Sequence, residues 1–197
     1  MKANLKTILP LVTAAISCTL SLAAGATDND YSADSDRHYS SNFTPIVNEV
    51  RRAVLNLKKE DLKNYGAILK TPCVSGPDFG AMGVHLINHT FVDAVVDVSK
   101  PEALIYEPQS NGKLRIVGVE YIVPKDAWDA ANPAQPGLPS PRPQLLGHLL
   151  NFVGSPNRFG IEGGFFEIHV WAFEDNRLGA LTDWNPGVTC EKQRLPH

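Results

Sequence analysis

The chain has 197 residues and a formal net charge of −3, with 18 basic against 21 acidic residues. It contains no basic run and no RNA- or DNA-binding motif, which excludes nucleic acid as an expected partner. The roughly 150 residues that follow the first 43 are enough for one hydrophobic core.

The first 26 residues have the pattern of a cleavable signal peptide. Lys2 and Lys6 form a basic start, an apolar stretch follows over 7–24, and small residues stand at positions −3 and −1 before Thr27. Prolines and hydroxylated residues dilute the apolar stretch below what a membrane anchor needs. We therefore predict an exported protein, periplasmic or extracellular, with signal peptide 1–26.

The main alternative for this segment is a lipoprotein anchored at Cys18. The leucine usual at position −3 from a lipidated cysteine is absent, and apolar chain continues past Cys18, so this alternative ranks second. Beyond residue 26 no apolar stretch is long enough to cross a membrane, so no membrane span is expected after cleavage.

Cleavage would leave two cysteines, Cys73 and Cys190. In an oxidising compartment, two thiols without metal-type spacing most simply form a disulfide, which we predict here. Such a bond would stabilise the fold by ~3–5 kcal/mol if unstrained. The alternative is a pair of free, buried thiols.

The mature chain divides into a flexible tether over 27–43 and a single globular domain over 44–197. The tether is rich in Asp, Ser, Asn and Tyr and has too few aliphatic residues to form a core. Apolar residues at helical spacing then predict a helix over about 45–58. A second short helix over about 60–65 is expected to stop at Gly66.

Alternating or β-rich stretches predict four strands, over 81–91, 102–107, 113–123 and 165–173. Asn111-Gly112 between the second and third stretches is a strong hairpin signal. Five prolines mark 129–143 as an irregular surface loop, and a short helix is expected over 144–153. The fold class is therefore α+β, with an N-terminal helical hairpin packed on an antiparallel sheet of at least four strands.

Alternation along the strands sorts their residues into two faces. One face of each strand is apolar or aromatic, whereas the other carries polar residues among apolar ones. If the strands share a sheet, four of these polar residues project from the same side: His85, Glu120, Glu167 and His169.

Two imidazoles and one or two carboxylates suit a divalent metal such as zinc, copper, iron or manganese. They also suit acid–base chemistry or a ligand pocket walled by Ile122, Phe165 and Trp171. The plainer alternative is a solvated sheet face, where His and Glu need no explanation, and one bulge would invert the parity. His89, near a strand end, and His148 are expected at the surface.

The chain contains the segments Met82-Gly-Val-His-Leu-Ile-Asn88, Pro101-Glu-Ala-Leu-Ile-Tyr-Glu-Pro108, Val117-Gly-Val-Glu-Tyr121, Glu167-Ile-His-Val-Trp-Ala172 and Asp183-Trp-Asn-Pro186 leading to Cys190, among others. Together these segments resemble a family of uncharacterised secreted bacterial proteins. The resemblance spans about residues 45–190. It implies export and a single domain. That family has no established activity, so it implies no catalytic residue.

Three functions remain open from the sequence. The first is an exported protein that binds a small ligand or a metal on the polar face of its sheet. The second is a metal-dependent enzyme that uses His85 and His169 as ligands and Glu120 or Glu167 as ligand or base. The third is an envelope or interaction protein without a small-molecule site. We rank binding first because the sequence offers no nucleophile and no diagnostic metal spacing.

Overall fold

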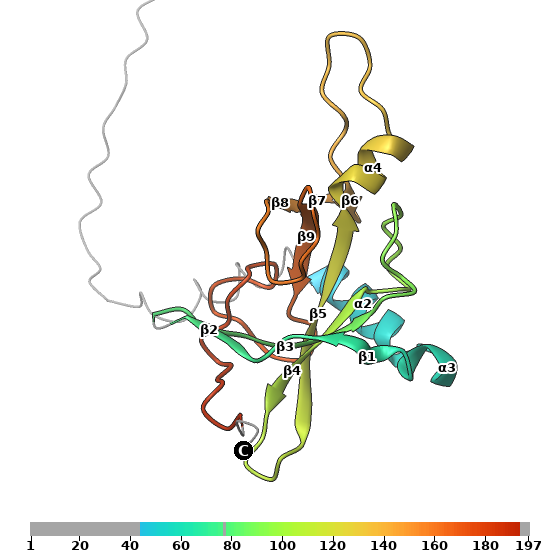
Figure 1. The fold of residues 1–197 in the computed structure, drawn as a ribbon. Coiled ribbons are helices and arrows are strands. Elements are labelled where there is room, and N and C mark those ends of the chain that lie inside the picture. Colours follow the sequence, from blue (N-terminus) through green and yellow to red (C-terminus); the bar gives the residue numbers. More distant parts are fainter. Residues whose placement is uncertain (1–43, 77, 194–197) are drawn as a thin grey trace, which may run out of the picture. The chain divides into compact units, whose positions relative to one another are not determined.

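A computed structural model describes residues 44–76 and 78–193 (Figure 1). The predicted signal peptide and tether lie outside these residues. Within the described residues, no helix is both long and apolar enough to span a membrane.

The described chain is α+β and contains three helices and nine strands. In chain order these are α2 (Thr44–Leu55), α3 (Lys59–Leu62), β1 (Tyr65–Lys70), β2 (Val74–Gly76), β3 (Gly80–Asn88), β4 (Ala103–Pro108), β5 (Leu114–Pro124), α4 (Lys125–Ala131), β6 (Gln144–Leu145), β7 (His148–Leu149), β8 (Asn151–Val153) and β9 (Phe165–Val170).

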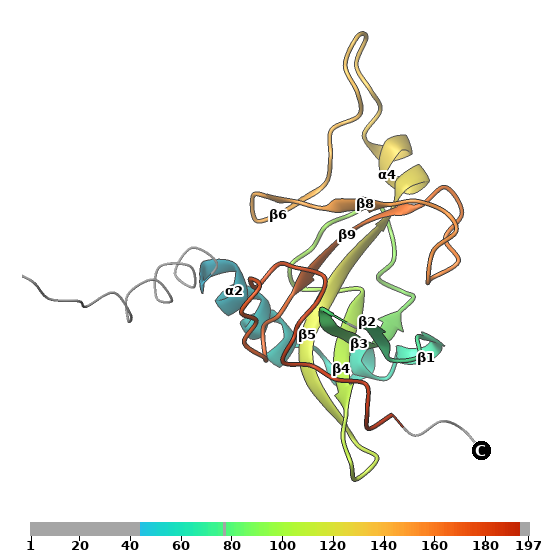
Figure 2. The ribbon, with the colours of Figure 1, turned by 90° about the vertical axis from the view of Figure 1, so that its left-hand side faces the viewer.

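Seven of the strands form one antiparallel sheet in the order β1-β3-β4-β5-β9-β8, and β2 pairs with the start of β3. The two short strands β6 and β7 pair with each other. β5 lies in the middle of the sheet between β4 and β9, as both ribbon views show (Figures 1 and 2). The prediction of an antiparallel sheet is confirmed.

The Asn-Gly hairpin is also confirmed. β4 and β5 pair antiparallel across the turn, and the backbone N–H of Gln109 donates to the Lys113 carbonyl at 2.8 Å. Gly112 has a φ of +78°, a conformation that glycine adopts without strain.

The helix expected over 144–153 is wrong, because this segment forms the short strands β6, β7 and β8. Leu146 and Gly147 have φ values of +49° and +88°, so the chain turns back after two strand residues. The second predicted helix is shorter than expected, since Tyr65 already begins β1. Helix α4 was not predicted, and its last three residues, 129–131, belong to the segment expected to be an irregular loop. The rest of that segment, residues 132–143, contains neither helix nor strand.

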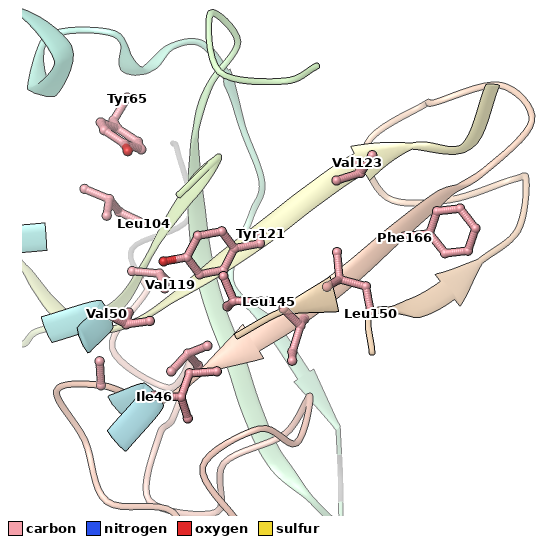
Figure 3. Close-up of a cluster of buried hydrophobic side chains, with 13 residues drawn as sticks. Ile46, Val50, Tyr65, Leu104, Val119, Tyr121, Val123, Leu145, Leu150 and Phe166 are labelled. Atoms are coloured by element: carbon pink, nitrogen blue, oxygen red, sulfur yellow. The ribbon is translucent and has the colours of Figure 1, made fainter. Parts of the chain in front are cut away.

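A large apolar cluster covers one face of the sheet (Figure 3). Ile46 and Val50 of α2 belong to it, together with Leu104, Val119 and Tyr121 from the central strands. The neighbouring residues of these strands point to the opposite face, where two smaller apolar clusters lie. The polar residues singled out in the sequence belong to this second face.

The predicted disulfide is present between Cys73 and Cys190, whose Cα atoms are 5.6 Å apart. It joins the segment between β1 and β2 to the chain that follows β9. A disulfide is consistent with an oxidising, exported location.

Candidate metal centre

The register of the sheet brings His85, Glu120 and His169 together from three strands. Glu120 of β5 lies directly opposite His169 of β9. On its other side Glu120 lies opposite Ala103 of β4, which is in turn opposite Ile87 of β3, two residues from His85. Because Ala103 carries only a methyl group, the longer side chains of His85 and Glu120 can meet over β4.

Three donor atoms of these residues converge on one point. His85 Nε2 lies 3.2 Å from His169 Nε2 and 3.2 Å from Glu120 Oε2, and His169 Nε2 lies 3.9 Å from the same oxygen. Ligand atoms in a tetrahedral zinc site, at about 2.0–2.1 Å from the ion, are about 3.4 Å apart. The three separations are close to those of three corners of such a site.

The outer nitrogen of each histidine faces an oxygen atom. His85 Nδ1 is 3.4 Å from Thr71 Oγ1, whereas His169 Nδ1 is 3.6 Å from Asp183 Oδ1 and has no hydrogen-bond partner among the described residues. Metal-bound histidines usually have their second nitrogen oriented by an oxygen in this way, which leaves Nε2 free to bind the ion. The interaction with His169 also lowers the pKa of Asp183.

Arg158, from the loop between β8 and β9, binds both glutamates of the polar face. Its Nη2 donates to Glu120 Oε1 at 2.6 Å and also to Glu167 Oε2. The guanidinium carbon lies 4.6 Å from the centre of the Phe159 ring, which packs edge-on against His85. The loop thus places a cation and an aromatic ring beside the three donor atoms.

The site is dry. The side chains of His85, Glu120 and His169 have an exposed fraction of 0%. Burial, reinforced by the neighbouring His169 and Arg158, holds the pKa of His85 well below its ordinary value. A neutral imidazole is the form that binds metal.

The same burial raises the pKa of Glu120 well above its ordinary value, and the nearby Glu167 adds to this effect. Arg158 opposes the increase. Among the residues that the structure describes, none forms a hydrogen bond with the buried Glu120 Oε2. A buried carboxylate oxygen in this condition is satisfied by binding a cation or a proton.

Glu167 lies beside the three-residue group rather than in it. Its carboxylate, His169 and Asp183 form a second set of donors within 4.8 Å of one another. His169 is common to both sets, with Nε2 toward His85 and Glu120 and Nδ1 toward Asp183. Glu120, Glu167 and Asp183 carry three negative charges when ionised, and Arg158 carries one positive charge, so a divalent cation would neutralise the whole group.

Two other histidines lie elsewhere. His89 is exposed just beyond the end of β3, and His148 is half-buried in β7. Neither belongs to a donor set among the described residues.

Sequence reasoning missed Thr71, Arg158 and Asp183, all of which lie outside the strands. The only sequence signal for them is indirect. Buried carboxylates need a cationic partner, so a group of glutamates on a sheet face predicts that some Arg or Lys lies nearby.

Two hollows of the described surface, of about 510 and 620 Å³, are lined by residues other than His85, Glu120 and His169. The residues expected to wall a ligand pocket, Ile122, Phe165 and Trp171, are buried in the two small clusters and line neither of these hollows. The space around the three donor atoms therefore fits an ion better than an organic molecule.

Comparison of the chain with protein-family models, curated proteins and solved structures gives no match. The resemblance noted in the sequence therefore stays an expectation.

Proposed function

We propose that this protein is an exported metal-binding protein that holds one divalent cation between His85, Glu120 and His169. The observation that carries the proposal is the convergence of two imidazole nitrogens and one carboxylate oxygen within 3.9 Å in a buried site. Two imidazoles and a carboxylate suit zinc, copper, iron or manganese.

The partners around the three ligands support a divalent ion in particular. Arg158 occupies Glu120 Oε1 and leaves Oε2 to bind as a single ligand atom. Thr71 and Asp183 face the outer nitrogens of the two histidines. A doubly charged ion also balances the formal charge of the group, which is the condition for a stable ion in a dry environment.

A metal-dependent enzyme is the second candidate. Three protein ligands leave a fourth position on a tetrahedral ion, which is where catalytic zinc sites bind water or substrate. The covering loop with Arg158 and Phe159 argues for binding over catalysis, because a substrate would first have to displace it.

Export is the other half of the proposal. The disulfide is consistent with an oxidising compartment, and the first 26 residues have the signal-peptide pattern. The finer prediction is that the mature protein begins at Thr27 in the periplasm or outside the cell.

The test is elemental analysis of the mature protein, purified from the periplasm without an affinity tag or chelator. We expect near-stoichiometric metal in the wild type and none in the His85→Ala/His169→Ala variant. Glu120→Gln keeps the shape of the side chain and should weaken zinc binding in calorimetric titration. The intact mass shows whether the chain begins at Thr27.

His89→Ala is the matched control, because His89 is an exposed histidine one residue beyond the same strand. It should keep its full metal content. Absence of metal from the wild type, even after incubation with zinc, copper, iron and manganese, would refute the metal site. It would leave an envelope or interaction role as the best remaining candidate.

A further inference from the structure

None of the three proposed metal ligands lines the hollow of about 510 Å³, although Thr71, which faces His85 Nδ1, is part of its lining. Its lining comes from β1, β3, the turn of the β4–β5 hairpin and the chain just after the disulfide. Three lysines line it, Lys70, Lys113 and Lys192, and no acidic residue does. All three are exposed, and in the described part of the chain none forms an ion pair.

The hollow is lined by three lysines and no acidic residue, whereas the chain as a whole has a net charge of −3. Nearby like charges raise the local potential and attract anions, all the more where no carboxylate cancels them. The lysines come from three separate segments, β1, the hairpin turn and the C-terminal segment, so only the fold brings them to one hollow.

The rest of the lining is largely apolar. Val84 and Leu86 of β3, Leu114 of β5 and Pro108 of β4 contribute to it. Leu114 has an exposed fraction of 43%, which leaves apolar surface open to a ligand.

Two glycines, Gly66 and Gly112, belong to the lining of this hollow. A Cβ atom at Gly66 would lie 3.0 Å from the Leu86 side chain, whereas Gly112 has nothing within 4 Å of its own Cβ position. Both glycines have a positive φ, so other residues would be strained there. The volume falls within the range typical of small-molecule sites.

We propose that this hollow binds a small amphipathic anion, with its acidic head at the lysines and its apolar body on Val84, Leu86 and Leu114. The proposal does not depend on the metal site. Each candidate ligand has one carboxylate, sulfate or phosphate head group attached to an aliphatic or aromatic body.

The test uses decanoate as the probe, added to the full mature protein labelled with ¹⁵N. We expect saturable shifts of the amide signals of Gly66, Leu86 and Gly112. The dissociation constant should increase about tenfold in Lys70→Glu/Lys113→Glu, because each substitution places a like charge beside the head. Raising the salt concentration should weaken binding as well.

Lys58→Glu/Lys59→Glu is the matched control, since it makes the same charge change at two exposed lysines that do not line the hollow. It should bind decanoate like the wild type. Decyltrimethylammonium, with the same chain and a cationic head, should not bind. No saturable binding of decanoate, equal binding of the cation, or shifts confined to other residues would each overturn the proposal.

Discussion

Arg158 is the residue on which the charge balance of the candidate metal centre depends. It is 20% exposed and pairs with the buried carboxylates Glu120 and Glu167. Removing one partner of a buried ion pair usually costs more than the pair itself contributes, because the remaining charge stays buried and unpaired.

We therefore expect Arg158→Met to destabilise the metal-free protein by about 3–5 kcal/mol. Added zinc should raise the melting temperature of this variant more than that of the wild type, because the ion replaces the missing positive charge. Thermal unfolding with and without zinc measures both effects.

Arg52→Met is the control for this experiment. Arg52 forms an exposed ion pair with Glu49, and its loss should change stability by less than about 1 kcal/mol. An equal zinc-induced shift in Arg158→Met and in the wild type would contradict the role assigned to Arg158.

The sequence predicted the three converging residues for a definite physical reason. His85, Glu120 and His169 lie on strands, and a strand alternates its side chains regardless of what its neighbours are. Thr71, Arg158 and Asp183 lie on loops, where no period relates position in sequence to direction in space. Their contacts with the site could not be predicted from one sequence.

At the scale of elements, the start of β3 depends on a close backbone approach. Ala81 and Asn185 exchange two backbone hydrogen bonds of 3.1 Å, and Gly80 just before them has a φ of +85°. A Cβ atom at Gly80 would lie 2.1 Å from the Asn185 carbonyl oxygen. The neighbouring backbone would have to move.

Gly80→Ala should therefore lower the free energy of unfolding by more than ~3 kcal/mol, because a backbone clash adds to the strain of a positive φ. Gly112→Ala is the matched control: it has a similar φ of +78° and an open surrounding, so it should lose only about 1–2 kcal/mol. Urea unfolding of both variants gives the comparison. Equal losses would mean that the contact at Asn185 is not tight in solution.

The elements that the sequence predicted best are those with a local chemical signal. The β4–β5 hairpin was identifiable because Asn111-Gly112 selects its turn. The prediction of a helix over 144–153 was wrong because the apolar residues of this segment fit helical spacing. The turn at Leu146 and Gly147 depends on the pairing of β6 with β7, which the spacing of apolar residues does not reveal. The packing of the first two helices as a hairpin over the sheet stays a prediction.

At the scale of the whole molecule, two cysteines far apart in sequence allowed a long-range contact to be predicted. Cys73 and Cys190 are 117 residues apart. Their contact was predictable only because they are the two cysteines that follow the predicted signal peptide. Export, the metal and the ligand of the lysine-lined hollow depend on chemistry outside the chain, so they stay proposals.

The disulfide lies close in sequence to the groups that face the outer nitrogens of the two histidines. Thr71, beside His85 Nδ1, stands two residues before Cys73, and Asp183, beside His169 Nδ1, stands seven residues before Cys190. Opening the bond removes the covalent link between these two segments. We expect the Cys73→Ala/Cys190→Ala variant to bind zinc about 10–100-fold more weakly, the usual effect of losing such orienting groups. Calorimetric titration of the folded variant measures this, and unchanged affinity would show that the two segments hold their places unaided.

For the proposed exported metal-binding protein, this arrangement implies an order of events during maturation. Thiol oxidation would come first and metal capture second, so a reduced chain still in the cytosol would compete poorly for the ions there. The metal that the protein acquires would then be decided by where it folds as well as by its ligands.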